Sequence, residues 1–296
     1  MYSERPAGPI ISLNSRIDVN MSNLVVETYS RLADKYGDEL NLQSCWGRAA
    51  DKIQNSLVIE DDDRVVVDVG CGTGRALCQL ASRCRPNVQL MGIEPAENTR
   101  KCAQRRVAGR QNISILDGCF EKIPIDSQSV DYLFSIFAFH RVTDLRASVR
   151  EIRRVLKADG RADLFFIGRN NGHEFIRKTS PIFLKYMGPA RFLESARMRT
   201  QLTKEEAVRL FSETFGARQV SVDESYETFY DSLEGHWGWW VRIEGQFLSI
   251  PAEARKACDQ EVRKALSELS TTRGIPYSIH CLHLMVRPGI ELQSGS

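Results

Sequence analysis

Several patterns that mark common protein classes are missing from this chain of 296 residues. Its eight cysteines include no Cys-x-x-Cys pair, and neither they nor the five histidines have zinc-ligand spacing, so we expect no metal site. The longest apolar run, near residues 132–139, is far shorter than the roughly 20 residues that span a bilayer. The first residues carry charges and prolines instead of the apolar core of a signal peptide. These absences predict a cytoplasmic protein with reduced cysteines and no membrane span.

An excess of charge of either sign is also missing. The 40 Lys and Arg residues nearly balance the 38 Asp and Glu residues, which leaves a formal net charge of +2. The basic residues of segment 101–110 have the spacing of a solvated helix face, so we expect no nucleic-acid partner. A hydrophobic content of 42% is typical of a globular protein with a sizeable core.

One segment combines a strand, a glycine-rich turn and a helix. Residues 65–69 are mostly valine, which is typical of a strand buried on both faces of a parallel sheet. Gly70, Gly72 and Gly74 follow, and residues 75–81 then have helical spacing. This succession is the first half of a nucleotide-binding βαβ unit, in which glycines let the backbone turn tightly and approach a ligand.

The spacing of these glycines argues against a dinucleotide ligand. In the dinucleotide fingerprint, Gly-x-Gly-x-x-Gly, the third glycine comes one residue later than Gly74 does. Asp68 also ends the predicted strand, and its carboxylate would repel a pyrophosphate but attract a cation. S-adenosylmethionine (SAM) carries a sulfonium and an ammonium group and no phosphate, so it suits this turn better.

Two further acidic residues end the next two predicted strands. Glu94 follows a strand over residues 88–94, about 20 residues beyond the glycine turn, where a carboxylate accepts hydrogen bonds from ribose hydroxyls. Asp117 follows a strand over residues 113–118. Each acid alone could be a helix cap or a solvated loop residue. Together with Asp68 they are expected at the same edge of the sheet, where doubly wound folds bind ligands.

Residues 68–74 resemble motif I of the class I SAM-dependent methyltransferases. Residues 123–131 are similar to the segment before the fourth strand in the ubiquinone/menaquinone-biosynthesis-like members of that family. The resemblance covers about residues 60–168. It implies SAM as cofactor and S-adenosylhomocysteine (SAH) as product, and it places Asp117 beside the adenine amino group. The expected cofactor-binding residues are Asp68, Gly70, Cys71, Gly72, Thr73, Gly74, Glu94, Pro95, Asp117, Gly118, Cys119, Phe120 and Phe137.

Alternating strand and helix patterns predict an α/β fold. The expected architecture is a Rossmann-like, doubly wound sheet of seven strands with N-terminal helices and helical cap insertions. The resemblance to the class I methyltransferases implies that the last strand, residues 279–286, pairs antiparallel beside the fifth. The expected divisions are a flexible tail (1–20), lid helices (21–60), the SAM-binding core (61–168), a cap insertion (169–202), a core helix and strand (203–230), a second aromatic insertion (231–274) and the last core strand (275–288).

Methyl transfer from SAM is an in-line displacement, in which positioning supplies much of the rate and some acceptors also need a general base. His140 is the first candidate because it follows the fourth predicted strand, at the ligand edge of the sheet. His173 and His236 lie in the two insertions and are further candidates. Each of the three could instead have a purely structural role.

The two insertions are rich in aromatic residues, which favours a hydrophobic small-molecule acceptor such as a quinone, a prenylated compound or a polyketide-like natural product. The expected substrate-binding residues are Tyr29, Tyr36, His140, Phe175, Phe183, Tyr186, Trp237 and Trp240. The tryptophan cluster of residues 237–240 could instead form a subunit interface, and the chain could be a monomer or a homo-oligomer. A non-catalytic SAM-binding scaffold and an NAD(P)-dependent oxidoreductase are the alternative functions.

Overall fold

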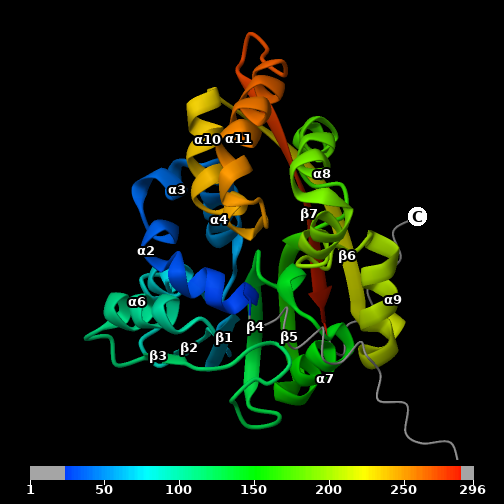
Figure 1. Cartoon of the computed structure of the whole chain (residues 1–296). Helices are drawn as coiled ribbons and strands as arrows, with labels where there is room; N and C mark the ends of the chain where they lie inside the picture. The colour runs from blue at the N-terminus through cyan, green and yellow to red at the C-terminus, as the bar shows by residue number, and fades with distance from the viewer. Residues whose placement is uncertain (1–23, 288–296) are drawn as a thin grey trace, which may run out of the picture.

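The computed structural model describes residues 24–287 of the chain (Figure 1). Seven strands form one sheet in the order β3-β2-β1-β4-β5-β7-β6. The first five strands run parallel, whereas β7 is antiparallel to both of its neighbours, β5 and β6. The strands are β1 (Val65–Val69), β2 (Gln89–Ile93), β3 (Ile113–Leu116), β4 (Val130–Ile136), β5 (Leu156–Ile167), β6 (Val220–Asp231) and β7 (Ile275–Val286). The predicted seven-stranded fold and the antiparallel place of the last strand are confirmed.

Helices cover both faces of the sheet. On one face lie α4 (Cys45–Ser56), α5 (Arg75–Ala81) and α6 (Glu97–Val107); on the other lie α7 (Leu145–Val155) and α9 (Lys204–Phe215). The remaining helical elements are residues 24–31, α2 (Ala33–Tyr36), α3 (Glu39–Gln43), η1 (Phe139–Arg141), α8 (His173–Ala196), η2 (Ala217–Gln219), α10 (Leu233–Arg242), η3 (Glu244–Phe247) and α11 (Ala252–Ser267). No helix among residues 24–287 is both long and apolar enough to cross a membrane.

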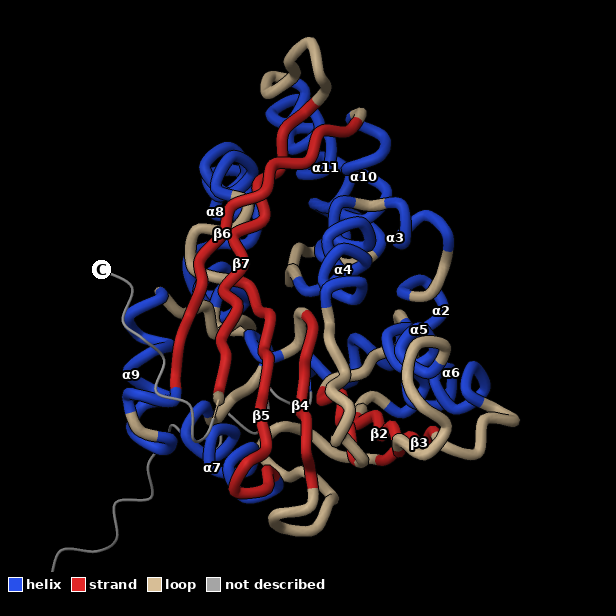
Figure 2. The backbone as a smooth tube through the Cα atoms, turned by 180° about the vertical axis from the view of Figure 1, so that it is seen from behind, coloured by secondary structure: helices blue, strands red, loops and turns tan. Residues whose placement is uncertain are grey.

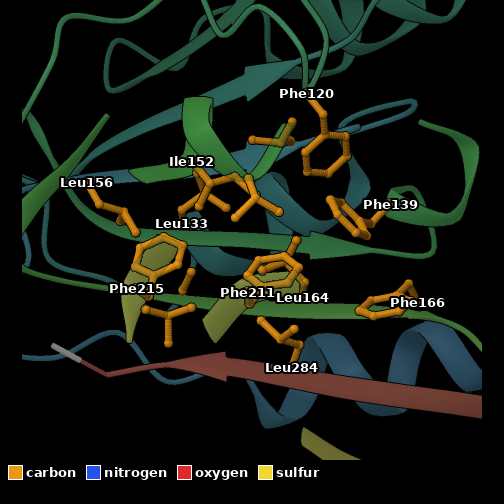
Figure 3. Close-up of a cluster of buried hydrophobic side chains, with 14 of the residues drawn as sticks. Phe120, Leu133, Phe139, Ile152, Leu156, Leu164, Phe166, Phe211, Phe215 and Leu284 are labelled. Atoms are coloured by element: carbon orange, nitrogen blue, oxygen red, sulfur yellow. The ribbon is translucent and has the colours of Figure 1, made fainter. Parts of the chain in front are cut away.

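Strand residues alternate between two apolar clusters, one on each face of the sheet. Val66 packs under α5, whereas its neighbour Val67 packs on the opposite side. Because both faces are buried, the strand needs apolar side chains in both directions, which explains the run of valines. On the α7 and α9 side, the ring centroid of Phe139 lies 5.3 Å from that of Phe166 and 5.5 Å from that of Phe211, and Figure 3 shows these rings in the cluster.

A second layer of structure stands above the carboxyl ends of the strands. Strands β6 and β7 are each 12 residues long and continue beyond the parallel strands, as Figure 2 shows. Helices α8, α10 and α11 pack against this extension and against α4. Their buried side chains form a third apolar cluster, separate from the two clusters that cover the sheet. This layer forms a roof over the edge of the sheet at which the ligand is expected.

Polar side chains cap the starts of two of these helices. Asp144 Oδ1 accepts the backbone N–H of Ala147 at 2.8 Å and so caps α7. Thr203 and Glu206 form the capping box at the start of α9. These polar side chains satisfy backbone groups that a helix terminus leaves without partners.

Three elements have boundaries that depend on their neighbours in the fold. Helix α8 consists of two helical segments that meet at a kink, where Gly188 has a φ of 74° just before Pro189. Helix α7 ends at Val155, because β5 begins at Leu156. Strand β6 is 12 residues long, and all of it pairs with β7. The expected tail, residues 1–20, lies outside the described residues.

Candidate active site

A cavity of about 290 Å³ lies at the carboxyl ends of β1, β2 and β4. Its floor consists of the turns that follow these strands, and its roof consists of the N-terminal helices and α10. Of the residues predicted from the sequence to form the site, the cavity is lined by Tyr29, Tyr36, Asp68, Gly70, Cys71, Gly72, Thr73, Glu94, Pro95, Cys119, Phe120, Phe137 and His140.

The glycine turn is held in place by the next strand. The N–H groups of Gly70 and Cys71 both donate to the carbonyl of Ile93, at 2.8 and 3.0 Å. Gly70 has a φ of +78°, and a Cβ atom there would lie 2.3 Å from that of Ala138. Glycine is therefore required at this position for both its conformation and its close approach to the loop after β4.

Gly72 differs from Gly70 because it faces open space. Its φ is +56°, and a Cβ atom added to it would meet no atom within 4 Å. Its N–H donates to Glu94 Oε2 at 3.0 Å, and Glu94 Oε1 accepts the N–H of Ala96 at 3.0 Å. The Glu94 carboxylate thus fixes the turn while lining the cavity.

Two buried carboxyl groups stand together behind the turn. Burial raises the pKa of Glu94 to about 6, although its two backbone hydrogen bonds and Arg100 act in the opposite direction. Burial and the nearby Glu94 raise the pKa of Asp68 well above its usual range. A cationic ligand beside this pair would relieve both effects, because an opposite charge favours the ionised carboxylate.

Three predicted cofactor residues do not line the cavity. The Asp117 side chain is 73% exposed and pairs with Arg100, with 3.0 Å between Oδ1 and Nη1. The reason is that β3 is the outermost strand of the sheet, so the side chain that follows it is exposed to solvent. Gly118 packs against Pro124. Gly74 is the N-cap of α5 and packs against Ala103.

Of the three candidate histidines, His140 lines the cavity and the other two do not. His140 is buried and lines the cavity, and its Nδ1 has no hydrogen-bond partner among residues 24–287. Burial, Arg141 and Arg199 lower the pKa of His140 well below its usual range, so its ring is neutral at pH 7. His173 and His236 are placed elsewhere. The His173 side chain is 60% exposed beside Glu174, and His236 Nε2 lies 2.8 Å from the carbonyl of Ile275 in the third apolar cluster.

Only some of the aromatic residues predicted to bind the substrate line the cavity. The rings of Tyr29 and Tyr36 face the cavity, with 5.2 Å between their centroids. Five others lie outside the cavity, because the roof has a core of its own. Phe175 and Phe183 pack against Trp240, Tyr186 donates a hydrogen bond to Glu261, and Trp237 lies under Arg263.

The sequence interpretation missed several residues of the cavity wall. Trp46 and Trp239 line it, with 6.1 Å between their ring centroids. Arg141 and Glu244 also line it and bring opposite charges into a largely apolar space. One signal was available: Arg141 directly follows His140, so both leave the carboxyl end of β4 at the predicted ligand edge.

Comparison with known proteins supports the fold and the domain. The family model described as "Methyltransferase domain" matches residues 67–163. Residues 67–163 are therefore similar to a methyltransferase domain. The matched segment runs from the middle of β1 to the middle of β5 and contains the glycine turn, Glu94 and His140. The resemblance to class I SAM-dependent methyltransferases is therefore confirmed.

The similarity to curated relatives is confined to part of the chain. The Bacillus subtilis (strain 168) protein YrhH, which is named as a methyltransferase, is 32% identical to this chain over 110 residues. These residues are 36% of this chain and 59% of YrhH. A demethylmenaquinone methyltransferase of Thermotoga maritima is 28% identical over 163 residues, which are 54% of this chain and 69% of that protein. The chain thus spans about three-fifths of the first of these relatives and about two-thirds of the second.

Solved structures share the fold at low sequence identity. The methyltransferase bound to the Trm112 methyltransferase activator of Haloferax volcanii superposes with a TM-score of 0.53, at 22% identity, over 88% of this chain and 98% of that chain. The YcgJ protein of Bacillus subtilis gives a TM-score of 0.54 at 17% identity, over 82% of this chain and all of that one. At such identities the likeness shows the fold alone.

Proposed function

We propose that this protein transfers the methyl group of SAM to a hydrophobic small molecule by in-line displacement. One observation carries the proposal: the buried Asp68 and Glu94 carboxylates, the glycine turn and an aromatic wall share one cavity inside a methyltransferase domain. The acid pair suits the positive charges of SAM, and the aromatic wall suits an apolar acceptor.

The residues present fit SAM on their own chemistry. Each oxygen of Glu94 already accepts one backbone N–H and retains a lone pair that could accept a ribose hydroxyl. Cys119 and Phe120 line the cavity beyond Glu94 and would flank the adenine ring. Gly72 has no Cβ atom, so the backbone can approach the ligand closely.

The chain itself would mainly position and shield the reactants. When bound, SAM supplies a methyl group that its sulfonium already activates. The roof residues Trp46 and Trp239 exclude water from the reacting atoms, and alignment of acceptor and methyl can lower the barrier by about 7–11 kcal/mol. His140 is neutral at pH 7 and can accept a proton from an acceptor hydroxyl.

Two observations support a hydrophobic acceptor. The cavity wall contains the rings of Tyr29, Tyr36, Trp46, Phe137 and Trp239. The Thermotoga maritima relative is named for demethylmenaquinone, which is a quinone with a prenyl tail. We therefore infer an acceptor with a flat apolar body, such as a quinone or an aromatic natural product.

Isothermal titration calorimetry with SAH and with NADPH tests the proposal. We expect SAH to bind with one site per chain and NADPH not to bind. Asp68→Asn should weaken binding of SAH by at least about tenfold, as expected for loss of a charge-assisted hydrogen bond. Asp61→Asn, at a side chain that is 90% exposed, is the matched control and should leave binding unchanged. Binding of NADPH but not SAH would replace this proposal with the oxidoreductase alternative.

A further inference from the structure

Arg141 brings a positive charge to the apolar cavity. It ends η1, directly after His140, and its side chain is only 9% exposed. Its Nε and Nη1 atoms are buried and have no hydrogen-bond partner among residues 24–287. Leaving charged donors buried and unsatisfied is costly, so a guanidinium held in this way indicates a binding site for an acceptor atom.

Aromatic rings hold the Arg141 guanidinium in place. Its Cζ atom lies 4.5 Å from the centroid of the Phe247 ring and 5.4 Å from that of Tyr29. Cation–π contacts of this kind bind the faces of the guanidinium and leave the N–H groups at its rim available for hydrogen bonds. The group is therefore fixed in orientation before any ligand arrives.

The local charge balance leaves one positive charge. Arg199 lies close to Arg141, and the two arginines share a single carboxylate. Glu244 forms an ion pair with Arg199, and its Oε1 lies 3.6 Å from Nη2 of Arg141. Burial and Arg141 lower the pKa of Arg199 to about 10, so Arg199 remains charged at pH 7. Two guanidinium groups and one carboxylate sum to +1, which matches a ligand with one negative charge.

A positively charged groove leads to the same residue. This groove, of about 600 Å³, shares Val25, Arg141 and Val142 with the cavity. Six arginines and two glutamates line it. Such a surface raises the local concentration of anions and speeds their association.

We propose that the methyl acceptor carries one carboxylate on an aromatic or otherwise apolar body, and that Arg141 binds this carboxylate. The inference rests on the proposed methyltransferase function and narrows its substrate class. The apolar body would lie against Tyr29 and Tyr36, and the carboxylate would accept hydrogen bonds from Arg141. His140 directly precedes Arg141 in the chain. An acceptor whose carboxylate is bound by Arg141 would therefore also lie beside the candidate base His140.

The test compares two probes of the same shape, 2-naphthoate and the uncharged 2-naphthamide. Each is titrated into the full chain, both with and without saturating SAH, and binding is followed by tryptophan fluorescence, since Trp46 and Trp239 line the cavity. We expect 2-naphthoate to bind about 10- to 100-fold more tightly than 2-naphthamide, as a charge-assisted hydrogen bond implies.

Substitutions of Arg141 separate an anchor for the acceptor from other roles. Arg141→Gln should abolish the preference for the acid and leave the affinity for SAH unchanged, and Arg141→Lys should retain part of the preference because it keeps the charge. The control is Arg146→Gln, in the groove but outside the cavity; its side chain is 70% exposed, and this variant should keep the full preference.

Several results would overturn the proposal. These are the absence of 2-naphthoate binding, equal affinity for the two probes, equal weakening of both probes in Arg141→Gln, and a matching loss of SAH affinity in that variant. The last result would assign Arg141 to the carboxylate of the cofactor. Failure of SAH to bind the unmodified protein would instead refute the methyltransferase function, and the preference for the acid would then be measured without SAH.

Discussion

Replacement of Gly72 by alanine tests the glycine turn without disturbing the core. Gly72 has a φ of +56°, and a Cβ atom there would meet no atom within 4 Å. The added methyl group therefore has two effects. It strains the backbone, because L-residues disfavour positive φ, and it occupies space that the proposed ligand needs.

The two effects act on different quantities. An alanine in the left-handed region costs about 1–2 kcal/mol of the free energy of unfolding, which lowers the melting temperature by about 2–8 °C for a domain of this size. A methyl group forced against a well-packed partner costs about 1–3 kcal/mol, so the affinity for SAH should fall by about 5- to 150-fold. The backbone strain is present both with and without ligand, so it does not contribute to the loss of affinity.

Gly109→Ala is the matched control. Gly109 has a φ of +84°, and a Cβ atom added to it would likewise meet no atom within 4 Å. It is exposed between α6 and β3, away from the cavity. Its alanine variant carries the same backbone strain, so its loss of stability should resemble that of Gly72→Ala. Its affinity for SAH should equal that of the unmodified protein.

Thermal unfolding and calorimetry with SAH provide the two readouts. The expected result is two variants of similar stability, of which only Gly72→Ala has lost affinity. Equal SAH affinity in the two variants would refute the placement of the ligand against this turn. A much larger loss of stability in Gly72→Ala would show that the space beside Gly72 is filled in the folded protein.

Three further predictions concern buried polar and charged side chains. Burial and Glu94 raise the pKa of Asp68, and a bound cation would lower this pKa again. Binding of SAM should therefore release protons, and the affinity for SAM should weaken as the pH falls. Calorimetry in buffers of different ionisation enthalpy measures the number of protons released. His140→Asn should lower turnover by about 100-fold without changing SAH affinity, as loss of a general base does; an unchanged rate would exclude that role. Asp63→Ala should reduce the free energy of unfolding in urea by about 3–5 kcal/mol. The reason is that the buried Arg161 loses its hydrogen bonds to both oxygens of Asp63, at 2.6 and 2.7 Å, and keeps only the exposed Glu60 as an ionic partner. A loss below about 1 kcal/mol would contradict this.

The sheet could be predicted because its signals are local. Each buried strand needs a run of apolar residues, and each helix start needs a polar cap, such as Asp144 or the pair Thr203 and Glu206. The glycine turn needs positive φ at Gly70 and Gly72, which only glycine adopts at low cost. These features are readable without knowledge of the partners across space.

The roof could not be predicted to the same depth, because its partners are distant in sequence. Residues 169–202 and 231–274 were both expected to cover the acceptor, yet most of their aromatic side chains pack against one another in a core of their own. Trp239 reaches the cavity, whereas Trp237 and Trp240 do not, and this difference depends on the rotation of α10 about its axis. The place of Asp117 depends in the same way on a partner outside its own strand, since Asp117 pairs with Arg100 at the exposed side of the sheet.

A crystal structure of the protein grown with SAH would show directly whether the glycine turn and the two buried acids bind the cofactor. We expect SAH in the cavity between Gly70, Gly72 and Glu94, with a ribose hydroxyl donating to Glu94 and the amino group on the side of Asp68. SAH bound elsewhere, or a cavity without SAH at saturating concentration, would contradict it.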